Sequence, residues 1–286
     1  MHVGFASMNN VENVRPDDLA GALEERGYES LWIGEHSHIP VARTTPYPAG
    51  GELPEPYTRM MDPYVSLMAA AAATTELTLA TGIALPLERP VLVAAKEIAT
   101  LDHLSGGRVV LGVGTGWNVE ELANLSPVSW RRRFRAIEEQ VSAMRALWLA
   151  DEAEFHGEFI DFDPVWSFPK PLQSPHPPIL MAGNGPMAIT HAVRWADGWY
   201  PVDIGFSDVA RGLARMAAIA EEAGRDPATL PVSLNVWHSD EDKLKRYRDL
   251  GIERVVIGAV EASLDGPSGT RRYLDRFAKV IPELRS

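Results

Sequence analysis

Residues 27–34 have the sequence GYESLWIG, and the same pattern returns near the end of the chain as GIERVVIG at residues 251–258. Residues 107–112, GRVVLG, form a shortened copy. The apolar run in each copy offers hydrophobic side chains to both faces, which is typical of a buried parallel strand. The leading glycine suits the end of a helix, where a left-handed backbone costs glycine little. Each copy therefore predicts the end of a helix followed by a buried strand.

Buried strands of this kind are expected at eight places along the chain. They cover residues 2–7, 30–34, 77–82, 108–114, 177–183, 197–202, 232–237 and 253–258. Helical patterns separate them, so strands and helices alternate through fewer than 300 residues. This alternation predicts an α/β fold, a (β/α)8 TIM barrel, that covers residues 1–286 as a single domain.

The signals for the intervening helices are of several kinds. Pro16 begins a helix that stops at Gly27, and Asp62-Pro63 opens the next one. A third helix is expected from about Pro90 to Leu104, and Ser239 with Asp242 resembles a capping box before the last strand. One long helix is marked by apolar residues at intervals of three and four, namely Phe134, Ile137, Val141, Met144 and Trp148.

Two segments interrupt the alternation. Residues 35–61, rich in proline and glycine, come directly after the second strand and are expected to project over the barrel mouth. Residues 152–176 precede the fifth strand and contain EFHGEFIDF, which predicts a hairpin. We therefore expect a barrel with one insertion after strand two and another before strand five.

The composition narrows the class of protein. The formal net charge is -12, so binding to nucleic acid or to an anionic membrane is not expected. The absence of cysteine excludes disulfides, thiolate metal sites and a cysteine nucleophile. The first ten residues lack a secretory signal pattern, and the apolar run at residues 68–73 is too short to cross a bilayer. A cytoplasmic protein is the expectation.

The segment GRVVLGVGTGWNVEE, residues 107–121, resembles a dinucleotide-binding turn at first sight. Gly112 and Gly114 fit that fingerprint, but Trp117 occupies the place of its third glycine. In a barrel, the residues that follow each strand meet at one mouth. We therefore expect the stretch after the fourth strand to form one wall of a cofactor pocket, through Gly114, Gly116, Trp117 and Asn118.

Four longer segments carry a family resemblance: GYESLWIGEH, the run from Leu77 to Trp117, FHGEFIDFDPVWSFPKP, and the run from Pro177 to Pro201. In this order they resemble the bacterial luciferase-like monooxygenase superfamily, and most closely its actinobacterial branch that depends on the deazaflavin coenzyme F420. The resemblance implies hydride transfer to or from a small organic molecule, with the cofactor ring in the barrel mouth. It also implies a homodimer.

The resemblance places the cofactor on two segments. At Thr81, Gly82 and Ile83 the family has a non-proline cis peptide bond, which forms a bulge behind the ring. The loop AGNGPMA, residues 182–188, opens a helix, where free N–H groups and the helix dipole favour a phosphate. The resemblance alone supports this placement, and a plain turn is the alternative. The loop residues assigned to the cofactor are Ala182, Gly183, Asn184 and Gly185.

His36 and Glu35, in IGEHSH, are the candidate catalytic residues, because the family places an acid–histidine pair beside the ring. Histidine changes its protonation near neutral pH and suits proton transfer. A hydrogen-bonded structural histidine is the alternative. A metal site at His36 and His38 is disfavoured, since such a site needs further histidines after later strands. His238 is the one other candidate ligand, so no metal is expected.

Three functions remain open at this stage. The first is an F420-dependent oxidoreductase, the second an FMN-dependent monooxygenase, and the third a catalytically silent family member that binds a flavin or nothing. Because FMN and F420 both carry a phosphate, the phosphate loop does not separate them. The basic run of Arg131, Arg132 and Arg133 is either a solvated face or a contact for the anionic tail of F420. Residues 35–61, with Tyr47 and Tyr57, are expected to determine the substrate.

Overall fold

Eight parallel strands form the centre of the molecule in a computed structural model that describes residues 1–285. Their order around the sheet is β8-β7-β4-β3-β2-β1-β10-β9. Two parallel bridges, Trp199 with Val232 and Val202 with Asn235, join β8 to β9 and close the barrel. The strands are β1 (His2–Ser7), β2 (Ser30–Ile33), β3 (Thr78–Ala84), β4 (Val109–Val113), β7 (Ile179–Ala182), β8 (Gly198–Tyr200), β9 (Ser233–Asn235) and β10 (Arg254–Gly258). The predicted (β/α)8 barrel is confirmed.

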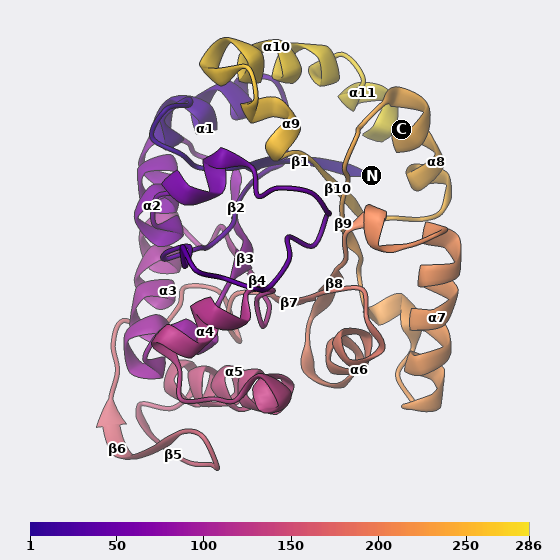
Figure 1. Ribbon diagram of the computed structural model, residues 1–286. Helices are drawn as coiled ribbons and strands as arrows, with labels where there is room; N and C mark the ends of the chain where they lie inside the picture. The colour runs from indigo at the N-terminus through magenta and orange to yellow at the C-terminus, as the bar shows by residue number, and fades with distance from the viewer. Residues whose placement is uncertain (286) are drawn as a thin grey trace.

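Helices surround the strands as an outer layer (Figure 1). The longer ones are α1 (Pro16–Glu25), α2 (Pro63–Ala73), α3 (Val91–Ser105), α5 (Arg133–Leu149), α6 (Pro186–Trp195), α7 (Val209–Glu222), α8 (Glu241–Asp249) and α10 (Gly266–Ala278). The shorter ones are α4 (Val119–Leu125), α9 (Val260–Ser263) and α11 (Ile281–Arg285). Within residues 1–285, no helix combines the length and apolar character needed to cross a membrane.

Glycine and capping signals end and begin these helices, with one correction. Gly27, after α1, and Gly106, after α3, both have φ of 76° and allow the chain to turn toward the next strand. The cap of α8 is Asp240, which accepts from Lys243 N, and not Ser239. The Ser239 hydroxyl instead donates to the carbonyl of Val236, which directs it away from the helix.

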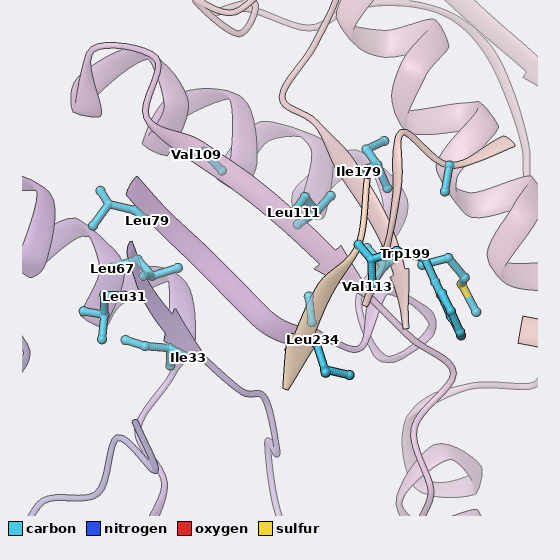
Figure 2. Close-up of a cluster of buried hydrophobic side chains, with 14 of the residues drawn as sticks. Leu31, Ile33, Leu67, Leu79, Val109, Leu111, Val113, Ile179, Trp199 and Leu234 are labelled. Carbon is cyan, nitrogen blue, oxygen red and sulfur yellow. The ribbon is translucent and has the colours of Figure 1, made fainter. Parts of the chain in front are cut away.

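Adjacent residues on each strand face opposite sides of the barrel wall. Leu31, Ile33 and Leu79 point outward into the layer between strands and helices, where Figure 2 shows them with other buried apolar side chains. Trp32, between Leu31 and Ile33, instead belongs to the cluster inside the barrel. That inner cluster consists of Ala6, Trp32, Ala80, Leu180, Tyr200 and Val256. Each large aliphatic side chain buried in these layers contributes roughly 1.5–3 kcal/mol.

The two insertions have different positions. The connection from β2 to α2 contains the 3-10 helix η1 (Glu55–Arg59) and crosses the centre of the view in Figure 1. The second insertion is an antiparallel hairpin of β5 (Glu152–His156) and β6 (Asp161–Trp166), as predicted. Glu139 of α5 holds the tip of this hairpin by accepting from the backbone N–H groups of Phe159 and Ile160.

The basic run at the start of α5 is divided among neighbours in the same chain. It begins in the 3-10 helix η3 (Trp130–Arg132). Arg132 forms an ion pair with Glu158 in the hairpin turn. The guanidinium of Arg133 lies 4.0 Å from the ring centre of Trp130 and donates to that residue's carbonyl oxygen. At least two of the three arginines therefore have structural partners.

Candidate active site at the barrel mouth

The floor of the barrel mouth is aromatic. The rings of Trp32 and Tyr200 are stacked, with centres 4.6 Å apart and planes 7° from parallel. The Tyr200 hydroxyl oxygen accepts from Asn235 Nδ2 at 3.1 Å, while burial raises the pKa of the phenol. Tyr200 consequently keeps its proton at neutral pH. The inside of the barrel below the mouth is thus filled by a buried, uncharged aromatic pair.

The end of β3 forms a bulge above this floor. The Gly82–Ile83 peptide bond is cis, as the resemblance implied, and the pairing of β3 with β4 shifts between Thr81 and Ala84. A Cβ added to Gly82 would lie 3.0 Å from the Tyr200 hydroxyl oxygen, and one added to Gly114 would lie 2.1 Å from Ile83 Cδ1. A side chain at Gly114 would therefore have to displace the end of the Ile83 side chain. The contact of this bulge with a cofactor stays a prediction.

His36 is held by two side chains that follow β4, two strands away in the barrel. Its Nδ1 lies 2.7 Å from Glu121 Oε2, and its Nε2 accepts from Trp117 Nε1 at 3.2 Å. The side chains of His36 and Glu121 are 8% and 1% exposed. With a carboxylate at Nδ1 and an N–H donor at Nε2, these partners assign the proton of neutral His36 to Nδ1. The Nε2 lone pair then points toward Trp117.

The acid beside His36 is Glu121, in place of the Glu35 expected from the sequence. The Glu35 carboxylate accepts from Leu85 N at 2.7 Å and from Arg89 Nε at 2.6 Å. The side chains of Glu35 and His36 thus bond to different partners, since His36 bonds to Glu121 and Trp117. Burial raises the pKa of Glu35 even though Arg89 opposes the shift. Glu35 is thus part of the scaffold around the site.

The connection from β2 to α2 is fastened over the site by Glu120. Its carboxylate accepts four hydrogen bonds, from the backbone and hydroxyl groups of Thr44 and Thr45. The side-chain bonds from Thr45 and Thr44 lower the pKa of Glu120 to about 2. Glu120 and Glu121 are adjacent, so α4 holds both this connection, which we call the lid, and the histidine.

Two tyrosines of the lid complete an aromatic wall. The hydroxyls of Tyr47 and Tyr57 lie 3.2 Å apart. The Tyr57 ring packs edgewise on His36, with centres 5.6 Å apart, and the Tyr47 ring packs on Trp117 at 6.0 Å. Trp117, selected from sequence as the tryptophan of the pocket, therefore contacts both His36 and Tyr47.

The loop predicted to bind phosphate is held in shape by its own polar groups. Gly183 has φ of 115°, and its carbonyl accepts from Trp199 Nε1 at 2.8 Å. The Asn184 side chain pairs with both backbone groups of Val202. The cap of α6 is Gly185, which has no side chain to accept a hydrogen bond. Backbone N–H groups in the first turn of α6 therefore have no capping partner. The loop is thus a preformed turn, and phosphate binding there stays a prediction.

The other predicted cofactor residues have mainly structural contacts. Thr81 donates its hydroxyl to the carbonyl of Gly112 at 2.7 Å. Asn118 caps α4 through Glu121 N at 3.3 Å, and its buried Nδ2 has no hydrogen-bond partner among residues 1–285. Gly116 has φ of 71°, and Ala182 packs against the cluster inside the barrel. These residues shape the mouth from two sides.

The two histidines of the sequence His36-Ser37-His38 have different partners. His38 lies at the surface, with Nδ1 2.9 Å from Ser37 Oγ and Nε2 2.9 Å from Asn124 Nδ2. Over residues 1–285, no group of three or more histidine, aspartate and glutamate side chains has an arrangement that could hold a metal ion. The geometry of the mouth therefore centres on His36, Glu121 and Trp117.

A family model described as luciferase-like monooxygenase matches residues 14–271. The chain belongs to this family. An uncharacterized protein of Mycobacterium tuberculosis is 39% identical over 284 residues, which are 97% of this chain and 98% of the relative. The F420-dependent hydroxymycolic acid dehydrogenase of the same organism is 30% identical over 260 residues, 87% of this chain and 66% of that protein.

Family members named for a different cofactor also match. The FMNH(2)-dependent dimethylsulfone monooxygenase of Pseudomonas putida is 35% identical over 138 residues, 48% of this chain and 38% of that protein. Among solved structures, an F420-dependent secondary alcohol dehydrogenase in complex with an F420-acetone adduct has a TM-score of 0.77 at 20% identity. That likeness covers 100% of this chain and 99% of the other, and it shows the fold.

Proposed function

We propose that this family member is an oxidoreductase that transfers a hydride between coenzyme F420 and a small organic substrate. The observation that carries the proposal is the arrangement of His36, Glu121 and Trp117 at the barrel mouth. Glu121 binds Nδ1 of the imidazole, and Nε2 accepts from Trp117 and can bind a proton. The 30% identity to an F420-dependent dehydrogenase supports the choice of cofactor.

The residues at the mouth fit a flat ring with a polar edge. The bulge at Gly82 and Ile83 would support the ring from behind, above the stacked pair of Trp32 and Tyr200. Asn235 has a buried amide oxygen without a partner among residues 1–285, so it is free to accept from a ring N–H. When bound, F420 supplies a carbon that accepts or donates the hydride.

The protein's own part is the proton that must move with the hydride. In alcohol oxidation, the hydroxyl proton passes to His36 Nε2 as the substrate replaces Trp117 at that nitrogen. Glu121 stabilises the resulting imidazolium through Nδ1–H, and Trp117 Nε1–H is free to bond the substrate oxygen. In the reverse direction, the imidazolium returns the proton to the oxygen of the carbonyl product.

The lid determines which substrates reach this point. Tyr47 and Tyr57 close the space beside His36 with apolar ring surface, and Glu120 fastens them through Thr44 and Thr45. A small substrate with one oxygen atom fits that environment.

We also propose a homodimer, as the resemblance implies, with exposed apolar side chains such as Val65 and Val93 on α2 and α3 available for the contact.

Titration of the purified protein with F420, FMN and FAD, followed by fluorescence quenching, tests the choice of cofactor. We expect F420 to bind at micromolar concentration or below and FMN at least about tenfold more weakly, a difference of roughly 1.4 kcal/mol. Equal or tighter FMN binding would favour the monooxygenase, which the relative from Pseudomonas putida supports. F420 binding without turnover of any alcohol or carbonyl would instead favour a silent binding protein.

Substitution in the loop before α6 tests the phosphate site. Gly185→Val is expected to weaken F420 binding at least about tenfold, because the new side chain would cover the N–H groups of the first turn. A Cβ at Gly185 meets no atom within 4 Å, and its backbone has φ of -73°, so the fold should tolerate it. Gly183→Val is a poorer test because φ is 115° there. Unchanged affinity in the folded Gly185→Val protein would place the phosphate elsewhere.

A further inference from the structure

The 3-10 helix η2 (Pro86–Glu88), which packs against α4, ends in a second acidic residue near Glu121, namely Glu88. The Oε2 atom of Glu88 and the Oε1 atom of Glu121 are both buried, and neither has a hydrogen-bond partner among residues 1–285. The other oxygen of Glu121 already binds His36. Two unpaired carboxyl oxygens in one buried region require a shared proton or a costly repulsion.

The surroundings of Glu88 decide between these two states. Burial raises the pKa of Glu88 to about 8, with the negative charges of Glu121 and Glu35 acting in the same direction, while Arg89 alone opposes them. From α5, the residue that bonds to η2 is Gln140, which is neutral and donates to the carbonyl of Pro86. At neutral pH Glu88 is therefore a carboxylic acid, with an O–H to donate.

We propose that Glu88 is a positioning residue, which donates its O–H to the free oxygen of Glu121 and so orients that carboxylate toward His36. Glu88, Glu121 and His36 then form one hydrogen-bonded chain. Glu35, whose charge also acts on Glu88, is already bound by Arg89 and Leu85. When Glu88 loses its proton, the chain breaks and a second negative charge faces Glu121.

The role of this chain in catalysis rests on the proposed function, but the chain itself exists without cofactor. It can therefore be tested by nuclear magnetic resonance on the cofactor-free protein with 13C-labelled glutamate and histidine, from pH 5 to pH 10. We expect the carboxyl carbon of Glu88 to titrate near pH 8. The ring signals of His36 should move in the same step, because Glu121 connects the two residues.

Variants separate a positioning role from a merely structural one. Glu88→Gln retains an N–H donor but cannot ionise, so the change of the His36 ring signals near pH 8, here called the His36 step, should disappear. The carboxyl signal that is missing from the spectrum of this variant is thereby assigned to Glu88. Glu121→Gln removes the largest neighbouring charge, and the titration of Glu88 should move at least one pH unit toward acid. Glu97→Gln is the matched control, since Glu97 binds Arg89 from outside the chain and should leave the His36 step unchanged.

Two results would overturn the proposal. The first is titration of Glu88 below pH 6 in the wild-type protein, which would make it an ordinary carboxylate at neutral pH. The second is titration near pH 8 that the ring signals of His36 do not follow, which would leave Glu88 as a structural acid. Neither measurement depends on F420, so a failure of the cofactor assignment would be recognised separately, in the fluorescence titration.

Discussion

His36→Ala is expected to retain the barrel and to lose at least about tenfold in kcat at saturating F420, which corresponds to about 1.4 kcal/mol. In the proposed mechanism, the imidazole Nε2 takes or returns the substrate proton, and Glu121, at Nδ1, stabilises the charged form. General acid–base assistance is typically worth about 10² to 10⁴ in rate. Steady-state kinetics with F420 held at saturation measure this loss.

The matched control is His38→Ala. His38 lies two residues away on the same connection, but it bonds to Ser37 and Asn124 at the surface. We expect this variant to keep kcat within about twofold, because those contacts do not reach the mouth. If His36→Ala recovers full kcat once F420 is saturating, His36 only positions the cofactor and the acid–base assignment is wrong.

The barrel could be predicted from sequence because its signals are local. GYESLWIG and GIERVVIG each end a helix with glycine and begin a buried strand, and both occupy those places as β2 and β10. The ends of the strands were less accurate, since β9 covers only Ser233–Asn235 of the predicted residues 232–237. Short strands depend on hydrogen bonds from their neighbours, which a single segment does not reveal.

The site was only partly predictable, and Glu35 and Glu121 show why. Glu35 is next to His36 in sequence, yet its carboxylate bonds to Leu85 and Arg89. Glu121 is 85 residues away in sequence, and its carboxylate reaches His36 because β2 and β4 end at the same mouth. The spacing of Trp117 and Glu121 in WNVEE gave no helix-face signal, because α4 begins at Val119 and Trp117 lies before it.

Burial was the property that sequence alone could not supply. Glu88 and Arg89 look like an ordinary surface pair in LPLERP, but η2 packs against α4 and α5, and Oε2 of Glu88 is buried. Arg89 likewise binds carboxylates from three separate segments. The roles of Glu88 and Arg89 follow from tertiary contacts. For Arg89, these contacts predict a large effect of substitution on the stability of the fold.

Arg89→Leu is expected to destabilise the fold by about 3–5 kcal/mol at pH 8, measured by urea unfolding. Arg89 Nε binds Glu35 at 2.6 Å, while its terminal nitrogens bind Asp62 at 2.5 Å and Glu97 at 3.0 Å. The Glu35 side chain is only 2% exposed, so loss of the guanidinium leaves a buried carboxylate without a cation. Asp62 also caps α2 through Val65 N, which extends the damage to the lid boundary.

The pH dependence identifies Glu35 as the cause. Burial holds the pKa of Glu35 above its usual value in the folded protein, and loss of Arg89 would raise it further. A group with a raised folded pKa favours the folded state below its unfolded pKa, and this contribution is lost as pH rises through the folded pKa. The deficit of Arg89→Leu should therefore be largest at pH 8 and shrink toward pH 5, as Glu35 takes up its proton.

Two comparisons complete this test. Arg89→Leu combined with Glu35→Gln should recover most of the lost stability and flatten its pH dependence, because no buried charge remains unpaired. Arg15→Leu, which breaks an exposed pair with Asp17, should change the stability little. A deficit of Arg89→Leu that is equal at pH 5 and pH 8 would mean that lost packing on Tyr64, 4.8 Å from the guanidinium, outweighs the charge of Glu35.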